Sequence, residues 1–323
     1  MHNETMGRGA AKLAIKCMIT ALLLWVAFRT VDVRAVSTLL LGLNWWWAAA
    51  ALLLTGVLIV SDAMLLRAVM RIFARRVRLG TAFLYSFVGW FFSNVAPSTF
   101  GGDIFRGVQL SRVGTPVATA VKVILSIRLL SLATLVVVMF AGFPIAVGLV
   151  EDRRDILLLA GTLGAASVAT VAILLLARFG WRNSTLERWR FFEKLMSASK
   201  SFRALLVPSS PAAGAWIAAL VQHLLRVGVL AALAAGLGLG IPVSTLFALT
   251  PAALLVAMVP MSIGGWGVRE LTFVYFLGTA GVSAEAALSL SVAFGLLRIF
   301  LGAIGGATWA ILNEDHFRVD AAV

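Results

Sequence analysis

Two segments far apart in the sequence share a proline, a pair of glycines and an arginine at identical spacing. They are Pro97-Ser-Thr-Phe-Gly101-Gly102-Asp103-Ile-Phe-Arg106 and Pro260-Met-Ser-Ile-Gly264-Gly265-Trp266-Gly-Val-Arg269. Proline and glycine break helices, and a helix that restarts after such a break offers free N–H groups and a positive dipole end to an anion. The arginine one turn further along can hold a phosphate through two hydrogen bonds. The repeat therefore predicts two parts of one anion site, with helix packing as the alternative role of the glycines.

The acidic residues beside the two motifs differ. Asp103 precedes Arg106 by three residues, so on a helix the two share a face and can form an ion pair. A helix N-cap is the equal alternative for Asp103. In the second copy Trp266 takes that position, and Glu270 follows Arg269. We therefore expect two related halves that are not chemically equivalent.

A second pair of arginines lies inside apolar runs: Arg128 in Ile124-Leu-Ser-Ile-Arg128-Leu and Arg298 in Phe294-Gly-Leu-Leu-Arg298-Ile. An arginine at the centre of a membrane costs on the order of 3 kcal/mol on insertion scales. Such a cost favours a functional role, with snorkelling of the side chain to an interface as the alternative. Arg298 also shares a helix face with Gly302 and lies near Gly305, so we expect another backbone to pack beside it.

Few other groups in the apolar segments can take up a proton. They are Asp62, His223 and Glu270, which are candidates for coupling proton binding to transport, with ordinary internal pairing as the alternative for each. The single cysteine and three histidines exclude a clustered Cys/His metal site. No lysine follows a glycine, so a Walker-type phosphate loop is absent. We expect no metal, no cofactor and no ATP-driven step.

The composition places these motifs in a membrane. Of 323 residues, 61% are hydrophobic and 13% are charged, with a mean hydropathy of +1.00, unlike any soluble domain of this length. Stretches long enough to cross about 30 Å of hydrocarbon predict six spans, at 13–28, 45–66, 115–149, 156–178, 211–239 and 286–312. Two further apolar stretches, 81–113 and 245–280, are divided by the motifs into short arms. We predict that each is a re-entrant helical hairpin, or that there are eight spans if both cross.

The basic residues indicate the orientation of the chain. The formal net charge is +13, but the lysines and arginines gather in loops, which is typical of the cytoplasmic side of a membrane and argues against nucleic acid. One cluster holds Arg67, Arg71, Arg75, Arg76 and Arg78, and another holds Arg178, Arg182, Arg188, Arg190, Lys194, Lys200 and Arg203. We expect both clusters and both termini in the cytoplasm. The segments 13–149 and 156–312 then form an all-α inverted-topology repeat within one membrane domain, with the substrate site between them and no soluble domain.

Three smaller features concern the membrane surface. The first apolar stretch lacks a cleavage pattern, so we expect a retained helix and not a signal peptide. Trp45, Trp46 and Trp47 fit an aromatic belt at the outer interface. The segment 184–196 begins with a capping-box pattern and carries apolar residues at helical spacing, which predicts an interfacial helix on anionic lipid.

The patterns Pro-x3-Gly-Gly-Asp-x2-Arg and Pro-x3-Gly-Gly-x-Gly-x-Arg-Glu resemble a flippase-like membrane family. That family is typified by the transmembrane region of lysylphosphatidylglycerol synthetases, and the likeness covers about residues 13 to 312. In the synthetases a soluble aminoacyl-transfer domain follows, whereas this sequence ends eleven residues past the last predicted span, at Val323. Members of the family often place an acid beside the arginine that corresponds to Arg128. Because this chain has Ile127 and Ser131 instead, we expect no ion pair at Arg128, which leaves it for a ligand.

The resemblance implies a non-enzymatic lipid translocase of the bacterial cytoplasmic membrane. The implied cargo is an anionic or phosphate-containing lipid, such as a phospholipid, aminoacylated phosphatidylglycerol, a polyprenyl-linked sugar or a hopanoid-related lipid. The expected charge partners of the headgroup are Arg106, Arg128, Arg269 and Arg298. The alternatives are a membrane enzyme that acts on lipid-linked phosphates and a non-transporting partner of lipid-biosynthesis enzymes.

Overall fold

The computed structural model describes residues 2–29, 31–73, 75–96, 100–179, 205–259 and 261–312. The structure is 85% helix, and the described residues contain no strand. Pro97 and Pro260 lie outside the described residues, and so does the interfacial helix predicted at 184–196.

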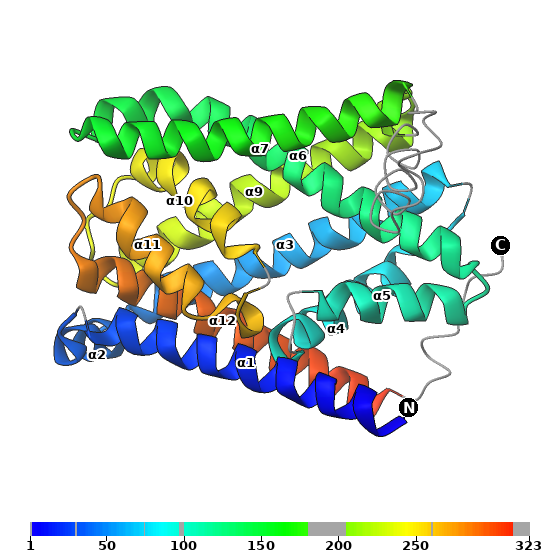
Figure 1. The fold of residues 1–323 in the computed structure, drawn as a ribbon, viewed down its shortest axis with the longest axis horizontal. Helices are drawn as coiled ribbons and strands as arrows, with labels where there is room; N and C mark the ends of the chain where they lie inside the picture. Colours follow the sequence, from blue (N-terminus) through cyan, green and yellow to red (C-terminus); the bar gives the residue numbers. More distant parts are fainter. Residues whose placement is uncertain are drawn as a thin grey trace.

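Five helices of the described chain are long and apolar enough to cross a membrane. They are α3 (Trp45–Ile72), α6 (Val117–Leu149), α7 (Arg153–Phe179), α9 (Ser210–Gly236) and α12 (Ala284–Ile311). They correspond to five of the six predicted spans and run along the long axis of the molecule (Figure 1). The sixth predicted span lies in α1 (His2–Arg29), which is not among the five. The side chains of the first half of α1 are outside the description.

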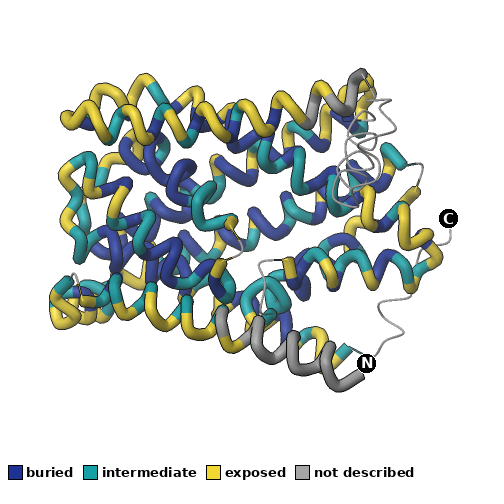
Figure 2. The backbone as a smooth tube through the Cα atoms, in the orientation of Figure 1, coloured by how far each residue is buried: buried dark blue, intermediate teal, exposed yellow. Residues whose placement is uncertain are grey.

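The centre of the bundle is formed by α3 and α9, which pack against each other along much of their length. Ser61 on α3 donates a hydrogen bond of 3.1 Å to the carbonyl oxygen of Ala218 on α9. Both helices are buried on most of their turns, whereas α7 faces outward (Figure 2). A short helix that the sequence did not predict, α2 (Val33–Leu41), occupies the predicted outer loop. It begins where Asp32 accepts a hydrogen bond from the backbone N–H of Arg34.

The first predicted hairpin range contains two short antiparallel helices, α4 (Leu79–Val95) and α5 (Gly101–Arg112). They approach so closely that a Cβ atom on Gly102 would lie 2.3 Å from the carbonyl oxygen of Gly89. The other side of α4 packs on α12, where a Cβ atom on Gly305 would lie 2.6 Å from the carbonyl oxygen of Phe87. The expected close approach of another backbone beside Arg298 is therefore confirmed.

The second predicted hairpin range contains α10 (Val243–Ala257) and α11 (Val268–Gly278), joined through the short 3-10 turn η1 (Ile263–Gly265). Here the glycines allow a left-handed backbone turn, since Gly264 has φ 61° and Gly265 has φ 81°. L-amino acids with a side chain rarely adopt such values. The paired glycines of the two motifs thus perform different tasks, close packing in the first copy and a left-handed turn in the second.

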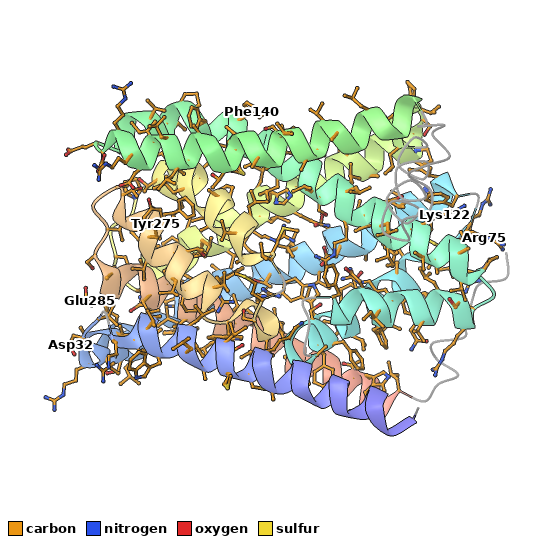
Figure 3. All side chains as sticks on the ribbon, viewed as in Figure 1. Asp32, Arg75, Lys122, Phe140, Tyr275 and Glu285 are labelled. Carbon is orange, nitrogen blue, oxygen red and sulfur yellow. The ribbon has the colours of Figure 1, made fainter. Side chains whose placement is uncertain are left out.

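The two ends of the bundle differ in charge. Arg75 and Lys122 lie at one end, and Asp32 and Glu285 lie at the other (Figure 3). α1 begins and α12 ends at the end that carries Arg75 (Figure 1). This distribution agrees with the grouping of loops expected from the sequence. The cavity described below lies between the two ends.

Candidate functional site

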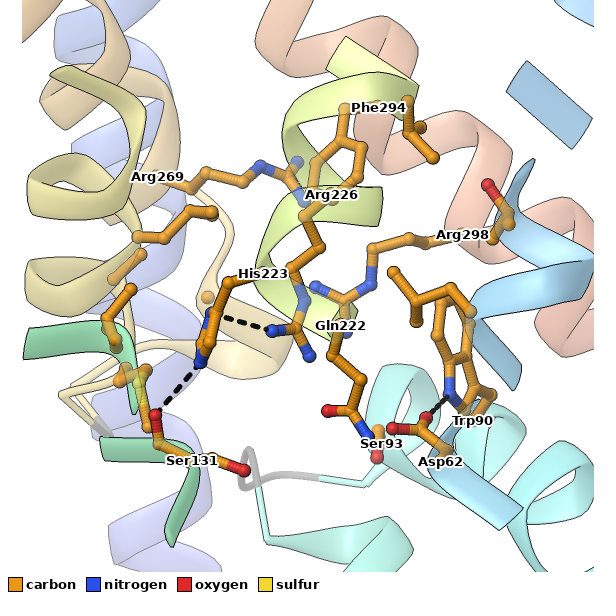
Figure 4. A pocket seen from close by; sticks show the side chains of 18 of the residues that line it. Asp62, Trp90, Ser93, Ser131, Gln222, His223, Arg226, Arg269, Phe294 and Arg298 are labelled. Carbon is orange, nitrogen blue, oxygen red and sulfur yellow. Dashed lines mark hydrogen bonds between the residues drawn. The ribbon is translucent and has the colours of Figure 1, made fainter. Parts of the chain in front are cut away.

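A cavity of about 240 Å³ lies in the interior of the bundle, between the two motif segments. Its described lining includes five arginines, which are Arg106 on α5, Arg128 on α6, Arg226 on α9, Arg269 on α11 and Arg298 on α12. The fold therefore brings together all four arginines that the sequence singled out, and it adds Arg226. Several of their side chains converge on the same space (Figure 4).

Asp103 is the shared partner of two of these arginines. Its carboxylate binds the Nε of Arg128 and lies 3.5 Å from Nη1 of Arg106. The prediction that Arg128 has no ion pair is therefore wrong: the acid comes from the neighbouring helix α5 and not from the next turn of α6. The N-cap alternative for Asp103 is also wrong, because α5 begins at Gly101, after Phe100, without a side-chain cap.

Asp62 on α3 connects the first motif to the centre of the bundle. Its Oδ2 accepts a hydrogen bond of 2.7 Å from the indole Nε1 of Trp90 and lies 3.8 Å from Nη2 of Arg106. Arg106 is therefore held between two carboxylates, although its Nε is buried and has no hydrogen-bond partner among the described residues. The ordinary pairing that was the alternative role of Asp62 is present.

The second motif forms a sealed ion pair. The side chains of Arg269 and Glu270 are 3% and 0% exposed, and Nη2 of Arg269 donates to Oε1 of Glu270 at 2.5 Å. Ser291 on α12 bonds to both side chains, at 3.1 Å and 3.2 Å, and the N–H of Gly267 donates to the other carboxylate oxygen at 2.7 Å. Trp266, which replaces the aspartate of the first copy, stacks on Arg269 with 4.6 Å between the guanidinium and the ring centroid.

The two remaining arginines form no ion pair with a described carboxylate. Nη1 of Arg226 donates to Nδ1 of His223 at 3.2 Å, and the carbonyl oxygen of Ser131 accepts from Nε2 of His223 at 2.9 Å. Because a guanidinium only donates, this geometry requires a neutral imidazole with its proton on Nε2. The guanidinium of Arg298 lies 5.8 Å from the ring centroid of Trp90.

Gln222 adds an unsatisfied group to the same region. It lines the cavity, is 2% exposed, and its Nε2 has no hydrogen-bond partner among the described residues. A buried amide without a partner is costly unless a ligand or water meets it. The Nε2 of Gln222 is therefore placed to donate a hydrogen bond to an oxygen of a ligand in the cavity.

The glycines of the two motifs occupy different places relative to the cavity. Gly264 and Gly265 line it, whereas Gly101 and Gly102 face α4 and are not among its lining residues. The expectation that the start of α5 aims free N–H groups at the cavity is therefore not supported.

Arg226 and Gln222 were not among the residues predicted for the site. A signal for Arg226 was present, since it lies within the apolar run of α9, as Arg128 and Arg298 do in theirs, one turn after His223. Gln222 carried no comparable signal, because a single glutamine beside a histidine has no distinctive spacing. Its role became visible only from its burial.

The long apolar helices, with a cavity between them that is lined by five arginines, indicate an integral membrane protein. Residues 13–306 match the family model described as the lysylphosphatidylglycerol synthase TM region, and the chain belongs to that family. Membership links this membrane protein to lipid metabolism. No match is found among curated proteins.

Proposed function

We propose that the chain is a flippase-like translocase that moves an anionic lipid between the leaflets of the membrane without ATP. The observation that carries the proposal is the cavity, in which five described arginines converge in the interior of an apolar bundle. Charged groups at such a depth are costly, and they commonly mark a substrate path. An anionic headgroup in the cavity would offset that cost while the acyl chains remain in lipid.

The proposal includes an inverted repeat of residues 13–149 and 156–312. The pair α4–α5 and the pair α10–α11 are then re-entrant hairpins that enter from opposite membrane faces and meet at the cavity. Support comes from Figure 1, in which α4 and α5 lie toward the end that carries Arg75, while α10 and α11 lie toward the other end. By the positive-inside rule, we propose that the end with Arg75 faces the cytoplasm and that both chain termini are cytoplasmic. The proposed membrane is the bacterial inner membrane.

In this mechanism the headgroup passes from one set of arginines to another. A headgroup that enters beside α5 meets Arg106 and Arg128, which share the carboxylate of Asp103. The headgroup then meets Arg298 on α12, which lies beside Trp90 of α4, and Arg226 on α9. Asp62 and His223 remain the candidate groups for proton coupling, because both line the cavity. Glu270 is a weaker candidate, since its carboxylate is fully engaged by Arg269, Ser291 and Gly267.

Reconstituted liposomes provide the test. The movement of a fluorescent phosphatidic acid between leaflets is followed by quenching of the outer leaflet, with wild-type protein and with the double variant Arg128→Ala and Arg298→Ala. We expect the variant to lose most of the protein-dependent rate, and the exposed pair Arg75→Ala and Arg76→Ala to retain it. Unchanged movement in the cavity variant would refute the site. Conversion of a polyprenyl phosphate by purified protein would instead indicate an enzyme.

A further inference from the structure

The balance of charge around the cavity limits which headgroups can bind. The described residues at the cavity comprise five arginines, together with the carboxylates Asp62 and Asp103 on its wall and Glu270 paired to Arg269 behind it. His223 is neutral by its hydrogen bonds. Two positive charges are therefore left without a carboxylate of their own.

The unbalanced charge is localised on Arg226 and Arg298. Asp103 is occupied by Arg106 and Arg128, and Glu270 is occupied by Arg269. Asp62 accepts a hydrogen bond from Trp90 and lies 3.8 Å from Arg106, and it forms no salt bridge with Arg226 or Arg298.

The two guanidinium groups share one space. The side chains of Arg226 and Arg298 point toward one another beside Gln222 (Figure 4), and two like charges that face each other repel. In a medium of low dielectric constant, two neighbouring cations are stable together only when anionic charge lies between them. The buried amide of Gln222 adds a hydrogen-bond donor without a described partner at the same place.

We infer that this site takes a lipid headgroup that carries two negative charges, a phosphomonoester or a diphosphate, in preference to a phosphodiester with one. The inference rests on the proposed function and narrows its cargo. A phosphomonoester is dianionic above its second ionisation, near pH 6, and it balances both arginines. A phosphodiester leaves one positive charge uncompensated. A headgroup that carries an added amino acid brings further positive charge and fits least.

Binding to the full-length protein in nanodiscs of phosphatidylcholine tests the inference. At pH 8 the probes are dioleoyl phosphatidic acid and dioleoyl phosphatidylglycerol, which share their acyl chains and differ in headgroup charge. We expect wild-type protein to bind phosphatidic acid at least about tenfold more tightly, because each hydrogen bond to a charged partner contributes on that order. Inorganic phosphate and pyrophosphate, added as competitors, distinguish a free anion from a lipid headgroup.

Three variants assign the preference to the two arginines. The double variant Arg226→Gln and Arg298→Gln should bind both lipids with nearly equal affinity. Arg226→Lys with Arg298→Lys keeps the charge and should keep most of the preference, which guards against loss of folding in the first variant. Arg75→Gln with Arg76→Gln removes two exposed charges far from the cavity and should leave the preference unchanged.

The possible results separate the two proposals. Equal binding of the two lipids by wild-type protein would overturn the inference of a dianionic headgroup and leave the translocase standing. Binding of neither lipid would overturn both. Competition by pyrophosphate at the same concentration as phosphatidic acid would assign the site to a free phosphate and overturn the lipid source.

Discussion

The two copies of the Pro, Gly-Gly, Arg motif give the protein two ion-pair clusters with opposite character. In the first, Asp103 serves two arginines, and the Arg128 side chain remains 29% exposed. In the second, Arg269 and Glu270 are sealed at 3% and 0% exposure and are bound by Ser291 and Gly267. A carboxylate shared by two arginines can release one of them to an incoming anion, whereas a fully engaged carboxylate cannot. We therefore propose that the first copy exchanges partners with a bound anion and that the second holds the cavity wall in place.

The largest effect is expected from Glu270→Gln in the sealed cluster. Removing one partner of a buried ion pair leaves the other charge uncompensated, so the free energy of unfolding should fall by about 3 to 5 kcal/mol. Unfolding by titration with sodium dodecyl sulfate in mixed micelles measures this loss. Glu151→Gln, at an exposed position, is the control and should change little. If Glu270→Gln lowered the free energy of unfolding by less than Asp103→Asn does in the first cluster, the comparison would be reversed.

Gly102→Ala tests the close approach of α4 and α5 on which the first cluster depends. The new methyl group would meet the Gly89 carbonyl oxygen, so the free energy of unfolding should fall by about 1 to 3 kcal/mol. Gly264→Ala has more space, with the nearest described side-chain atom at 3.3 Å, and should lose about 1 kcal/mol through its positive φ. The same unfolding titration compares them. An equal or larger loss for Gly264→Ala would show that close packing is not what distinguishes the first motif.

Ser291→Ala tests whether the second cluster contributes to stability and not to lipid binding. The hydroxyl accepts from Arg269 and donates to Glu270, so its removal should cost about 1.5 kcal/mol of unfolding free energy. Binding of phosphatidic acid should not change, because the serine does not line the cavity. Altered lipid affinity with unchanged stability would place this cluster in the binding machinery instead.

Asp103→Asn should have the smallest effect on stability and a distinct effect on binding. After the change Arg106 keeps Asp62 as a partner and Arg128 is 29% exposed, so the free energy of unfolding should fall by no more than about 1 kcal/mol. The arginines released from the carboxylate should tighten the binding of phosphatidic acid by about fivefold, equivalent to about 1 kcal/mol. Nanodisc binding measures the second effect, with Asp32→Asn as an exposed control. Weaker binding would mean that Asp103 orients the arginines and does not compete with the ligand.

The sequence by itself determined the class of protein, five of the spans and four of the cavity arginines. These features are local. The length of an apolar run predicts a span, and an arginine within such a run can be recognised from the sequence alone. The predicted hairpin ranges, 81–113 and 245–280, also located both pairs of short helices, α4–α5 and α10–α11. The helix α2 was missed because its outer loop is short and was interpreted only for its charge.

Only the tertiary structure decided which charges meet. Asp103 reaches Arg128 across 25 residues, and Ser291 reaches Glu270 across 21, through the packing of α5 on α6 and of α11 on α12. The pattern of neighbours along one helix predicted no partner for Arg128, because that partner comes from another helix. Arg226 and Gln222 likewise joined the site only when α9 was packed at the centre of the bundle. The sequence determines which charged residues are present. Helix packing decides which of them form ion pairs, because the partners of a side chain in a bundle come from several helices.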